Sequence, residues 1–295
     1  MKIAVTGSEG MIGSLLVQEL KAKGHKVIEC TKNSCDILDI ESVKRAFKGA
    51  EVVVHCAAQL DEEAKDLHEV NVTGTDNVLE ACAANNVSQF IFLSTVGVFG
   101  GSAGIKDENT EPRPETLYER SKLEAEKKVL SFQEVFHVTI LRGAIVMGNN
   151  KYWQQIVKTV KKGFPLIGEG KNHWQVVSPM DLVSAVIFCI GREECYGEIF
   201  IVAEKEALTL EEIINVMRKE LGLEGATGKI PLWLGNIIVA LNSLLNFNPI
   251  LKPAYVKRLQ ADRIYSTKKI EALGWMAKHS AKDCIRKIIS EKSDN

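Results

Sequence analysis

A glycine-rich loop directly after a short apolar run restricts the possible folds of this chain more than any other feature. Residues 1–5 suit a buried parallel strand, and residues 6–13 then read Thr-Gly-Ser-Glu-Gly-Met-Ile-Gly. Glycines at this spacing permit a tight turn, close approach of a pyrophosphate and close packing of the next helix. Residues 11–23 have apolar residues at helical spacing, and the start of a helix favours a phosphate. Because strand, loop and helix follow one another, the sequence predicts a dinucleotide site.

Strand-like apolar runs alternate with helical segments over the first two thirds of the chain. The runs are residues 2–5, 26–30, 51–56, 89–94, 137–142 and 198–202. This alternation predicts an α/β fold, a doubly wound parallel sheet of the Rossmann type. Beyond Gly148 the rhythm weakens, which indicates a smaller C-terminal substrate-binding lobe. We assign residues 1–150 and about 175–203 to the dinucleotide-binding domain, and about 151–174 and 204–295 to the lobe.

A phenol and an ammonium lie one helical turn apart, at Tyr118 and Lys122. Hydride transfer at an alcohol carbon needs a group that exchanges the hydroxyl proton, and an ammonium lowers the pKa of a nearby phenol. Ser94 and Thr95 add hydroxyls at the expected carboxyl edge of the sheet, where ligands bind. With the glycine loop, these residues predict a hydride-transferring enzyme. The alternative is a surface pair, since the same helix has further charged residues: Glu119, Arg120, Glu124, Glu126, Lys127 and Lys128.

Composition argues against several classes of protein. There are 37 basic and 38 acidic side chains, so no nucleic-acid-binding surface is expected. The seven cysteines are odd in number, lack a Cys-x-x-Cys spacing and mostly lie in apolar segments, which predicts buried thiols and no metal site. No charged and then apolar leader precedes the first strand, so we expect a cytoplasmic protein.

An apolar stretch at residues 231–251 is about as long as a membrane span. Its asparagines and Gly235 argue against spanning. We expect a buried or substrate-covering helix here. Contact with a membrane surface and a true span are the alternatives.

The chain resembles the extended short-chain dehydrogenase/reductases, which include nucleotide-sugar epimerases, dehydratases and reductases, 3β-hydroxysteroid dehydrogenases and dihydroflavonol-type reductases. The resemblance runs nearly from end to end. Its motifs are the glycine loop at 6–13, Asp36-Ile-Leu-Asp39, His55-Cys-Ala-Ala58, Asn71-Val-Thr-Gly-Thr75, residues 93–100, Tyr118-x-x-x-Lys122, Leu141-Arg142 with Gly148, and Ser178-Pro-Met-Asp181. It implies an NAD(P)-dependent enzyme with this Rossmann fold.

The resemblance also implies residue roles. Tyr118 would donate the proton in reduction, and Lys122 would lower its pKa and bind the nicotinamide ribose. Thr95, four residues before Phe99, would orient the carbonyl in preference to Ser94. The other implied cofactor contacts are Gly7, Gly10, Met11, Ile12 and Gly13 at the pyrophosphate, Asp36 and Ile37 at the adenine, Ala57, Ala58 and Gln59 at the ribose and nicotinamide, and Ile145 and Val146 at the carboxamide.

The end of the second strand bears on the choice of cofactor. NAD-using members usually have an Asp about eighteen residues after the last loop glycine, where this chain has Thr31 and then Lys32. A hydroxyl and an ammonium attract a 2′-phosphate that a carboxylate would repel. NADP is therefore favoured, and NAD bound through backbone groups is the alternative.

Departures from the family pattern bear on the reaction. Val96 and Gly97 stand where dehydratases have Asp-Glu, so dehydration is not expected. Residues 143–147 lack the Asn found in many epimerases. We expect reversible reduction of a keto group on a nucleotide-linked sugar. The alternatives are an epimerase, a dehydrogenase of an apolar alcohol such as a 3β-hydroxysteroid, and a non-catalytic NAD(P) sensor. A homodimer through helices at about 71–85 and 118–132 is the expected assembly.

Overall fold

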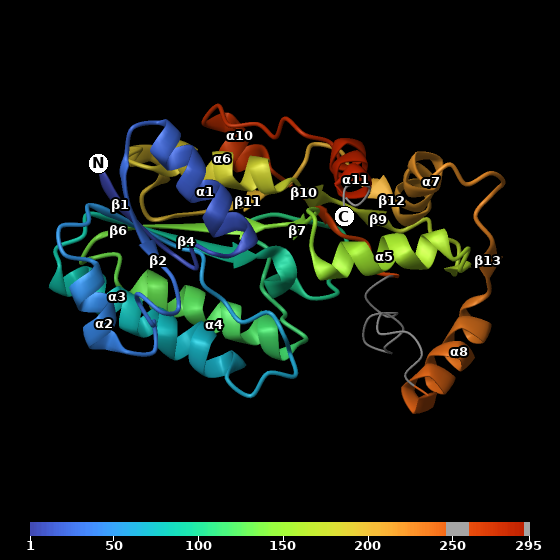
Figure 1. The fold of residues 1–295 in the computed structure, drawn as a ribbon, viewed down its shortest axis with the longest axis horizontal. Helices are drawn as coiled ribbons and strands as arrows, with labels where there is room; N and C mark the ends of the chain where they lie inside the picture. Colours follow the sequence, from blue (N-terminus) through green and yellow to red (C-terminus); the bar gives the residue numbers. More distant parts are fainter. Residues whose placement is uncertain (246–259, 292–295) are drawn as a thin grey trace.

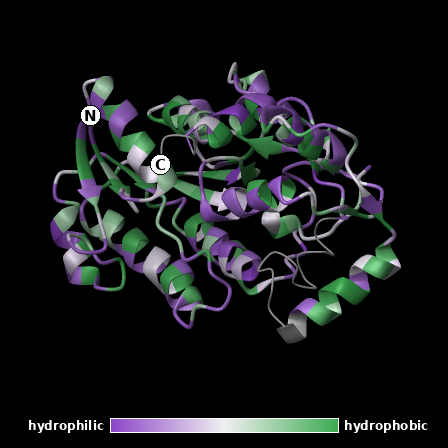
Figure 2. Ribbon diagram, turned by 45° about the vertical axis from the view of Figure 1, so that its right-hand side comes forward, coloured by the Kyte–Doolittle hydropathy of each residue, from purple (hydrophilic) through white to green (hydrophobic). Residues whose placement is uncertain are grey.

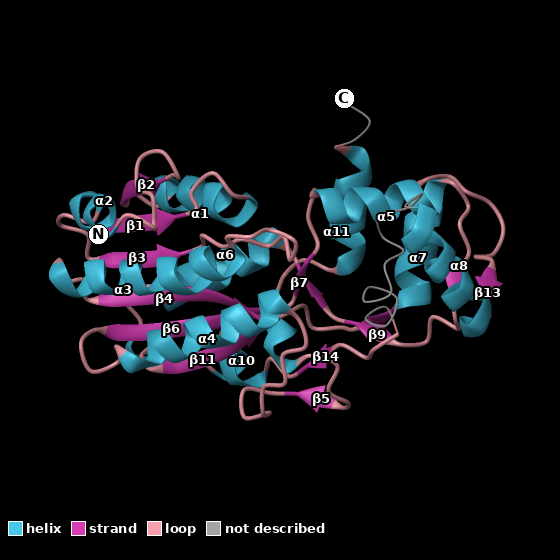
Figure 3. Cartoon of the chain, turned by 90° about the horizontal axis from the view of Figure 1, so that it is seen from below, coloured by secondary structure: helices cyan, strands magenta, loops and turns pink. Residues whose placement is uncertain are grey.

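The computed structural model describes residues 1–245 and 260–291, which contain a parallel six-stranded sheet (Figure 1). The strands are β1 (Lys2–Thr6), β2 (Lys26–Cys30), β3 (Val52–His55), β4 (Gln89–Thr95), β6 (His137–Gly143) and β11 (Glu198–Val202). Their order is β11-β6-β4-β3-β1-β2, and every neighbouring pair is parallel (Figure 3). The predicted doubly wound parallel sheet is therefore confirmed.

Helices cover both faces of the sheet because successive side chains of a strand point to opposite sides. Ile3 and Val5 of β1 belong to the core on one face, and Ala4 belongs to the core on the other. The first face is covered by α1 (Met11–Ala22), α6 (Pro179–Cys189) and α10 (Lys268–Ala272), which lie above the sheet in Figure 1. The second is covered by α2 (Ile40–Ala46), α3 (Gly74–Ala84) and α4 (Leu117–Ser131), with the π-helical turn η1 (Glu69–Thr73) before α3.

A smaller lobe follows the sheet. Its helices α5 (Lys151–Lys161), α7 (Leu210–Glu220) and α11 (Ala281–Ser290) share a core that contains Trp153, Ile213 and Ile285. The short strand pairs are β5 (Ile105–Lys106) with β14 (Ile264–Tyr265), β7 (Ile145–Val146) with β10 (Val176–Val177), β8 (Leu166–Ile167) with β13 (Lys229–Ile230), and β9 (His173–Trp174) with β12 (Leu208–Thr209). Two 3₁₀ turns are η2 (Val96–Phe99) and η3 (Glu193–Cys195). The domain limits given above stay a prediction.

The apolar stretch expected at 231–251 contains helix α8 (Leu232–Leu245), and its residues 246–251 lie outside the described part. Gly235 and Val239 pack toward Ile167 of β8, but Trp233 is 65% exposed and Leu241 is 50% exposed. The helix is therefore only half covered by the described residues, and Figure 2 colours most of its ribbon as hydrophobic. Among the residues that the structure describes, no helix is both long and apolar enough to cross a membrane.

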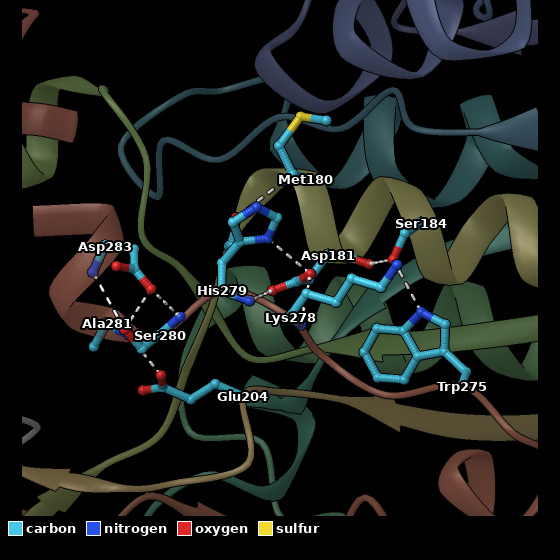
Figure 4. A network of polar contacts seen from close by, with 11 residues as sticks. Met180, Asp181, Ser184, Glu204, Trp275, Lys278, His279, Ser280, Ala281 and Asp283 are labelled. Carbon is cyan, nitrogen blue, oxygen red and sulfur yellow. Dashed lines mark hydrogen bonds and ion pairs between the residues drawn. The ribbon is translucent and has the colours of Figure 1, made fainter.

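A network of polar contacts ties the segment before α11 to helix α6 (Figure 4). The buried Asp181 carboxylate accepts hydrogen bonds from the backbone amides of Lys278 and His279, at 3.0 and 2.9 Å, and lies 2.9 Å from His279 Nδ1. Glu204 accepts a 2.6 Å bond from the amide of Ala281 at the start of α11. Burial raises the pKa of the Glu204 carboxyl to about 7. These contacts hold the last helix of the lobe against the sheet domain.

Candidate active site

The glycine loop between β1 and α1 forms a cradle with no room for side chains. Gly7 has φ +65°, and a Cβ there would lie 2.8 Å from the Ala57 backbone nitrogen. A Cβ on Gly13 would lie 2.1 Å from the Gly7 carbonyl oxygen. Gly10 caps α1 without a side-chain hydrogen bond, so the first amides of the helix have no side-chain cap at this position. Such amides and the helix dipole suit a pyrophosphate.

Two cavities extend from this cradle along the carboxyl edge of the sheet. The larger, about 380 Å³, contains Gly7, Gly10, Met11, Ile12, Gly13, Thr95, Tyr118, Lys122, Ile145 and Val146 in its wall. The smaller, about 250 Å³, contains Gly7, Thr31, Lys32, Asp36, Ile37, Ala57, Ala58 and Gln59 in its wall. The structure thus brings every predicted cofactor residue to one of two adjoining cavities. This arrangement fits a dinucleotide, with the glycine cradle between its two halves.

A third cavity, also about 380 Å³, lies on the other side of the predicted catalytic residues. Thr95, Tyr118 and Ile145 line both this cavity and the larger cofactor cavity. Its remaining wall includes polar and charged side chains that the sequence reasoning did not select: Glu115, Glu119, Arg263 and Tyr265. We call it the substrate cavity. The two hydroxyl-bearing residues therefore stand where a cofactor and a substrate would meet.

The hydroxyls of Ser94 and Thr95 make different contacts at the end of β4. Thr95 Oγ1 accepts a 3.0 Å hydrogen bond from the Gly97 amide, so its own proton is available to a ligand. Ser94 Oγ, which also lines the larger cofactor cavity, instead donates a 2.5 Å bond to Glu126 Oε1, so its proton is already used within the protein. This difference supports the choice of Thr95 over Ser94 as the residue that orients a substrate oxygen.

Tyr118 and Lys122 lie at the start of α4, which begins with a capping box between Thr116 and Glu119. Burial, and next the Glu119 carboxylate, raise the pKa of the Tyr118 phenol. The predicted lowering of that pKa by Lys122 is absent from this structure. The Lys122 ammonium lies 3.9 Å from the centre of the Phe92 ring, is almost fully buried, and has its own pKa lowered to about 7 by that burial. Burial thus disfavours the charged form of both groups.

The residues that sequence reasoning missed come from distant segments. Arg263 lies just before β14, and its guanidinium is 5.0 Å from the centre of the Trp174 ring. Asp262 accepts a 2.7 Å hydrogen bond from the His173 amide and lies 3.3 Å from His173 Nδ1. A two-residue strand leaves no periodic pattern, so the sequence alone did not predict that Arg263 would line this wall. No cluster of three His, Cys, Asp or Glu side chains within 1–245 and 260–291 is arranged to hold a metal ion.

Fold and site together define a dinucleotide-dependent enzyme that acts on an alcohol or ketone. The family model described as the NAD dependent epimerase/dehydratase family matches residues 3–203. The chain belongs to this family, and it is an NAD(P)-dependent enzyme of the extended short-chain dehydrogenase/reductase type.

Several proteins similar to this chain carry the names of enzymes that act on nucleotide-linked sugars. A UDP-glucose 4-epimerase of Vibrio cholerae is 28% identical over 260 residues, covering 78% of this chain and 79% of that protein. A dTDP-4-dehydrorhamnose reductase of Mycolicibacterium smegmatis is 36% identical over 141 residues, covering 44% of this chain and 42% of the reductase, so that match spans less than half of either. The structure of a Thermotoga maritima UDP-glucose 4-epimerase has a TM-score of 0.81 at 21% identity and covers both chains fully, which supports the fold.

Proposed function

We propose that this protein transfers a hydride reversibly at an alcohol or ketone carbon of a nucleotide-linked sugar. The observation that carries the proposal is that Thr95 and Tyr118 line both the cofactor cavity and the substrate cavity. The names of the Vibrio and Mycolicibacterium relatives refer to nucleotide-linked sugars. Glu119 and Arg263 give the substrate cavity a polar wall, which favours a hydroxylated, charged substrate over an apolar alcohol such as a steroid.

The proposed roles follow from the contacts of each side chain. A bound nicotinamide supplies or accepts the hydride. In reduction, the Tyr118 phenol donates a proton to the substrate oxygen, and its raised pKa keeps it protonated at neutral pH. The Thr95 hydroxyl donates a hydrogen bond to the same oxygen, because its proton is not used in the contact with the Gly97 amide. Lys122 holds the nicotinamide ribose with its ammonium.

NADP is the proposed cofactor because of the groups at the end of β2. Thr31 is fixed by hydrogen bonds with Ser34, with 3.0 Å between the two hydroxyl oxygens, and Lys32 is exposed beside it. Glu29, the acidic residue of β2, is paired with Lys21 at 2.5 Å. The wall thus offers a hydroxyl and an ammonium to a 2′-phosphate. Stronger thermal stabilisation by NADPH than by NADH is the expected result, and a preference for NADH would contradict it.

Tyr118→Phe tests the activity. We expect it to abolish turnover of a panel of nucleotide-linked keto sugars while NADPH still binds, as measured by isothermal titration calorimetry. Tyr196→Phe is the control, because Tyr196 stacks on His137 and lines none of these three cavities. Turnover by the Tyr118→Phe protein would refute the assigned role. If the parent protein turns over no member of the panel, a non-catalytic NAD(P) sensor is favoured.

An epimerase is the second candidate. The Vibrio cholerae relative, which aligns with most of this chain, carries that name. An epimerase regenerates its cofactor in every cycle and has no need to release it, whereas a reductase exchanges it. Mass spectrometry of small molecules released from freshly purified, denatured protein separates the two: stoichiometric NAD supports the epimerase, and an empty protein supports the reductase.

We further propose a cytoplasmic homodimer. All seven cysteine thiols are free and six are buried, as predicted, which suits a reducing compartment. The dimer would form through η1 with α3 and through α4, the helices expected from the sequence. Light scattering coupled to size-exclusion chromatography measures the mass, and a monomer of 32.6 kDa would contradict the dimer. The exposed face of α8 offers a membrane contact, which flotation with lipid vesicles tests.

A further inference from the structure

Three charged and polar side chains form a buried group beneath the candidate active site. Arg142 of β6 and Glu126 of α4 are 4% and 1% exposed and form a two-pronged ion pair, with Nη2 to Oε2 at 2.7 Å and Nε to Oε1 at 3.0 Å. Ser94 Oγ donates to the same carboxylate at 2.5 Å. We call these three residues the buried charge cluster. Each belongs to an element that also contributes to the wall of the cofactor cavity.

The cluster lies next to Lys122. Glu126 follows Lys122 by one turn on the buried face of α4, so the carboxylate and the ammonium are neighbours. Burial lowers the pKa of Lys122 to about 7, and Glu126 is the group that opposes this most. Without an opposing charge, the ammonium would lose its proton at a still lower pH.

Two other titratable groups that interact with Lys122, Cys56 and His55, carry no negative charge. Burial raises the pKa of the Cys56 thiol, at the end of β3, to about 12. Burial lowers the pKa of His55 to about 3, so its ring is neutral. The Tyr118 phenol is protonated, since its pKa is raised. Phe92 of β4 presents only its ring face. Glu126 is therefore the anion next to Lys122 among these groups, and Arg142 holds that anion in place.

We propose that Glu126 is a positioning residue: its carboxylate, fixed by Arg142 and Ser94, lies one helical turn from Lys122 and favours the charged form of that ammonium. This inference rests on the role proposed for Lys122. A purely structural ion pair would also hold α4 against β6, but it would not set the charge of a neighbouring lysine.

The test is a pH titration of the cofactor-free protein by NMR with carbon-13-labelled lysine. Lys122 titrates near neutrality, apart from exposed lysines, and its signal is identified by its loss in Lys122→Arg. Glu126→Gln alone leaves a buried guanidinium unpaired and weakens the fold, so Glu126→Gln with Arg142→Met is the decisive variant. We expect its Lys122 midpoint to fall by about one pKa unit. Glu126→Asp, which keeps the charge, restores most of the shift.

Glu124→Gln is the matched control, because Glu124 is on the same helix but 50% exposed and paired with His68. We expect the Glu124→Gln substitution to leave the titration midpoint of Lys122 unchanged. The inference is overturned if the Glu126→Gln, Arg142→Met protein has a native circular dichroism spectrum and an unshifted Lys122 midpoint. A different result tests the proposed function: if Lys122→Met retains full turnover, the role of Lys122 fails, whereas the titration still decides whether Glu126 sets its charge.

Discussion

Replacing Lys122 by methionine should stabilise the cofactor-free protein while abolishing its activity. Burial lowers the pKa of Lys122 from 10.5 to about 7. At 1.36 kcal/mol per unit, a difference of about 3.5 units means that the charged lysine costs the folded state about 5 kcal/mol. Loss of the contact with Phe92 returns about 2 kcal/mol of this. We therefore expect the Lys122→Met protein to be about 3 kcal/mol more stable at pH 6.

The pH dependence of this difference identifies its cause. Between pH 7 and 10.5 the unfolded chain binds a proton at Lys122 that the folded protein has released, so the stability of the parent protein rises with pH. The advantage of Lys122→Met is thus full below pH 7 and shrinks by about 1.4 kcal/mol per pH unit above it. Urea unfolding from pH 6 to 10 measures it, with the exposed Lys127→Met as the control. An advantage that does not change with pH would refute the reasoning.

Three further substitutions test other parts of the site. Gly13→Ala places a Cβ 2.1 Å from the Gly7 carbonyl oxygen and should weaken NADPH binding about 100-fold by calorimetry. Thr31→Asp sets a carboxylate where a 2′-phosphate would bind, so the ratio of NADPH to NADH affinity should fall about 10-fold or more; an unchanged ratio would place the phosphate elsewhere. Asp181→Ala leaves two amides and His279 without their acceptor and should cost about 3 kcal/mol in urea unfolding, and a loss below about 1 kcal/mol would mean that the α6 contact is dispensable.

The sheet was predictable because its inner strands, β1, β3, β4 and β6, are largely buried on both faces. The runs expected at 26–30 and 198–202 coincide with β2 and β11. Strands β1, β4 and β6 each extend one residue beyond the expected carboxyl end, and β3 is one residue shorter at both ends. Local sequence is enough here, since a fully buried strand must be apolar along its length. The glycine loop was also predictable from local sequence. The contacts that exclude side chains at Gly7 and Gly13 come from the loop itself and from the residues just after β3.

The charged residues of α4 were not predictable in this way. The many charged residues of this helix suggest that Glu119 and Glu126 are exposed to solvent. In the structure they are only 8% and 1% exposed. Their burial depends on partners in other elements, such as Arg142, which follows Glu126 by sixteen positions. Arg263 likewise reaches the substrate cavity only because β14 pairs with β5, more than 150 residues earlier. Sequence periodicity shows which residues share one face of a helix or strand. It does not show which residues of other elements pack against that face.

The pairing of β14 with β5 has a consequence for biosynthesis. All six strands of the main sheet are present once residue 202 has left the ribosome, so the nascent chain already holds the glycine cradle. The substrate cavity is different, because Ile264 and Tyr265 must first return to Ile105 and Lys106. Such distant contacts form late, after the entropy of a long loop has been overcome. We therefore expect a growing chain to complete its cofactor cavities before its substrate cavity.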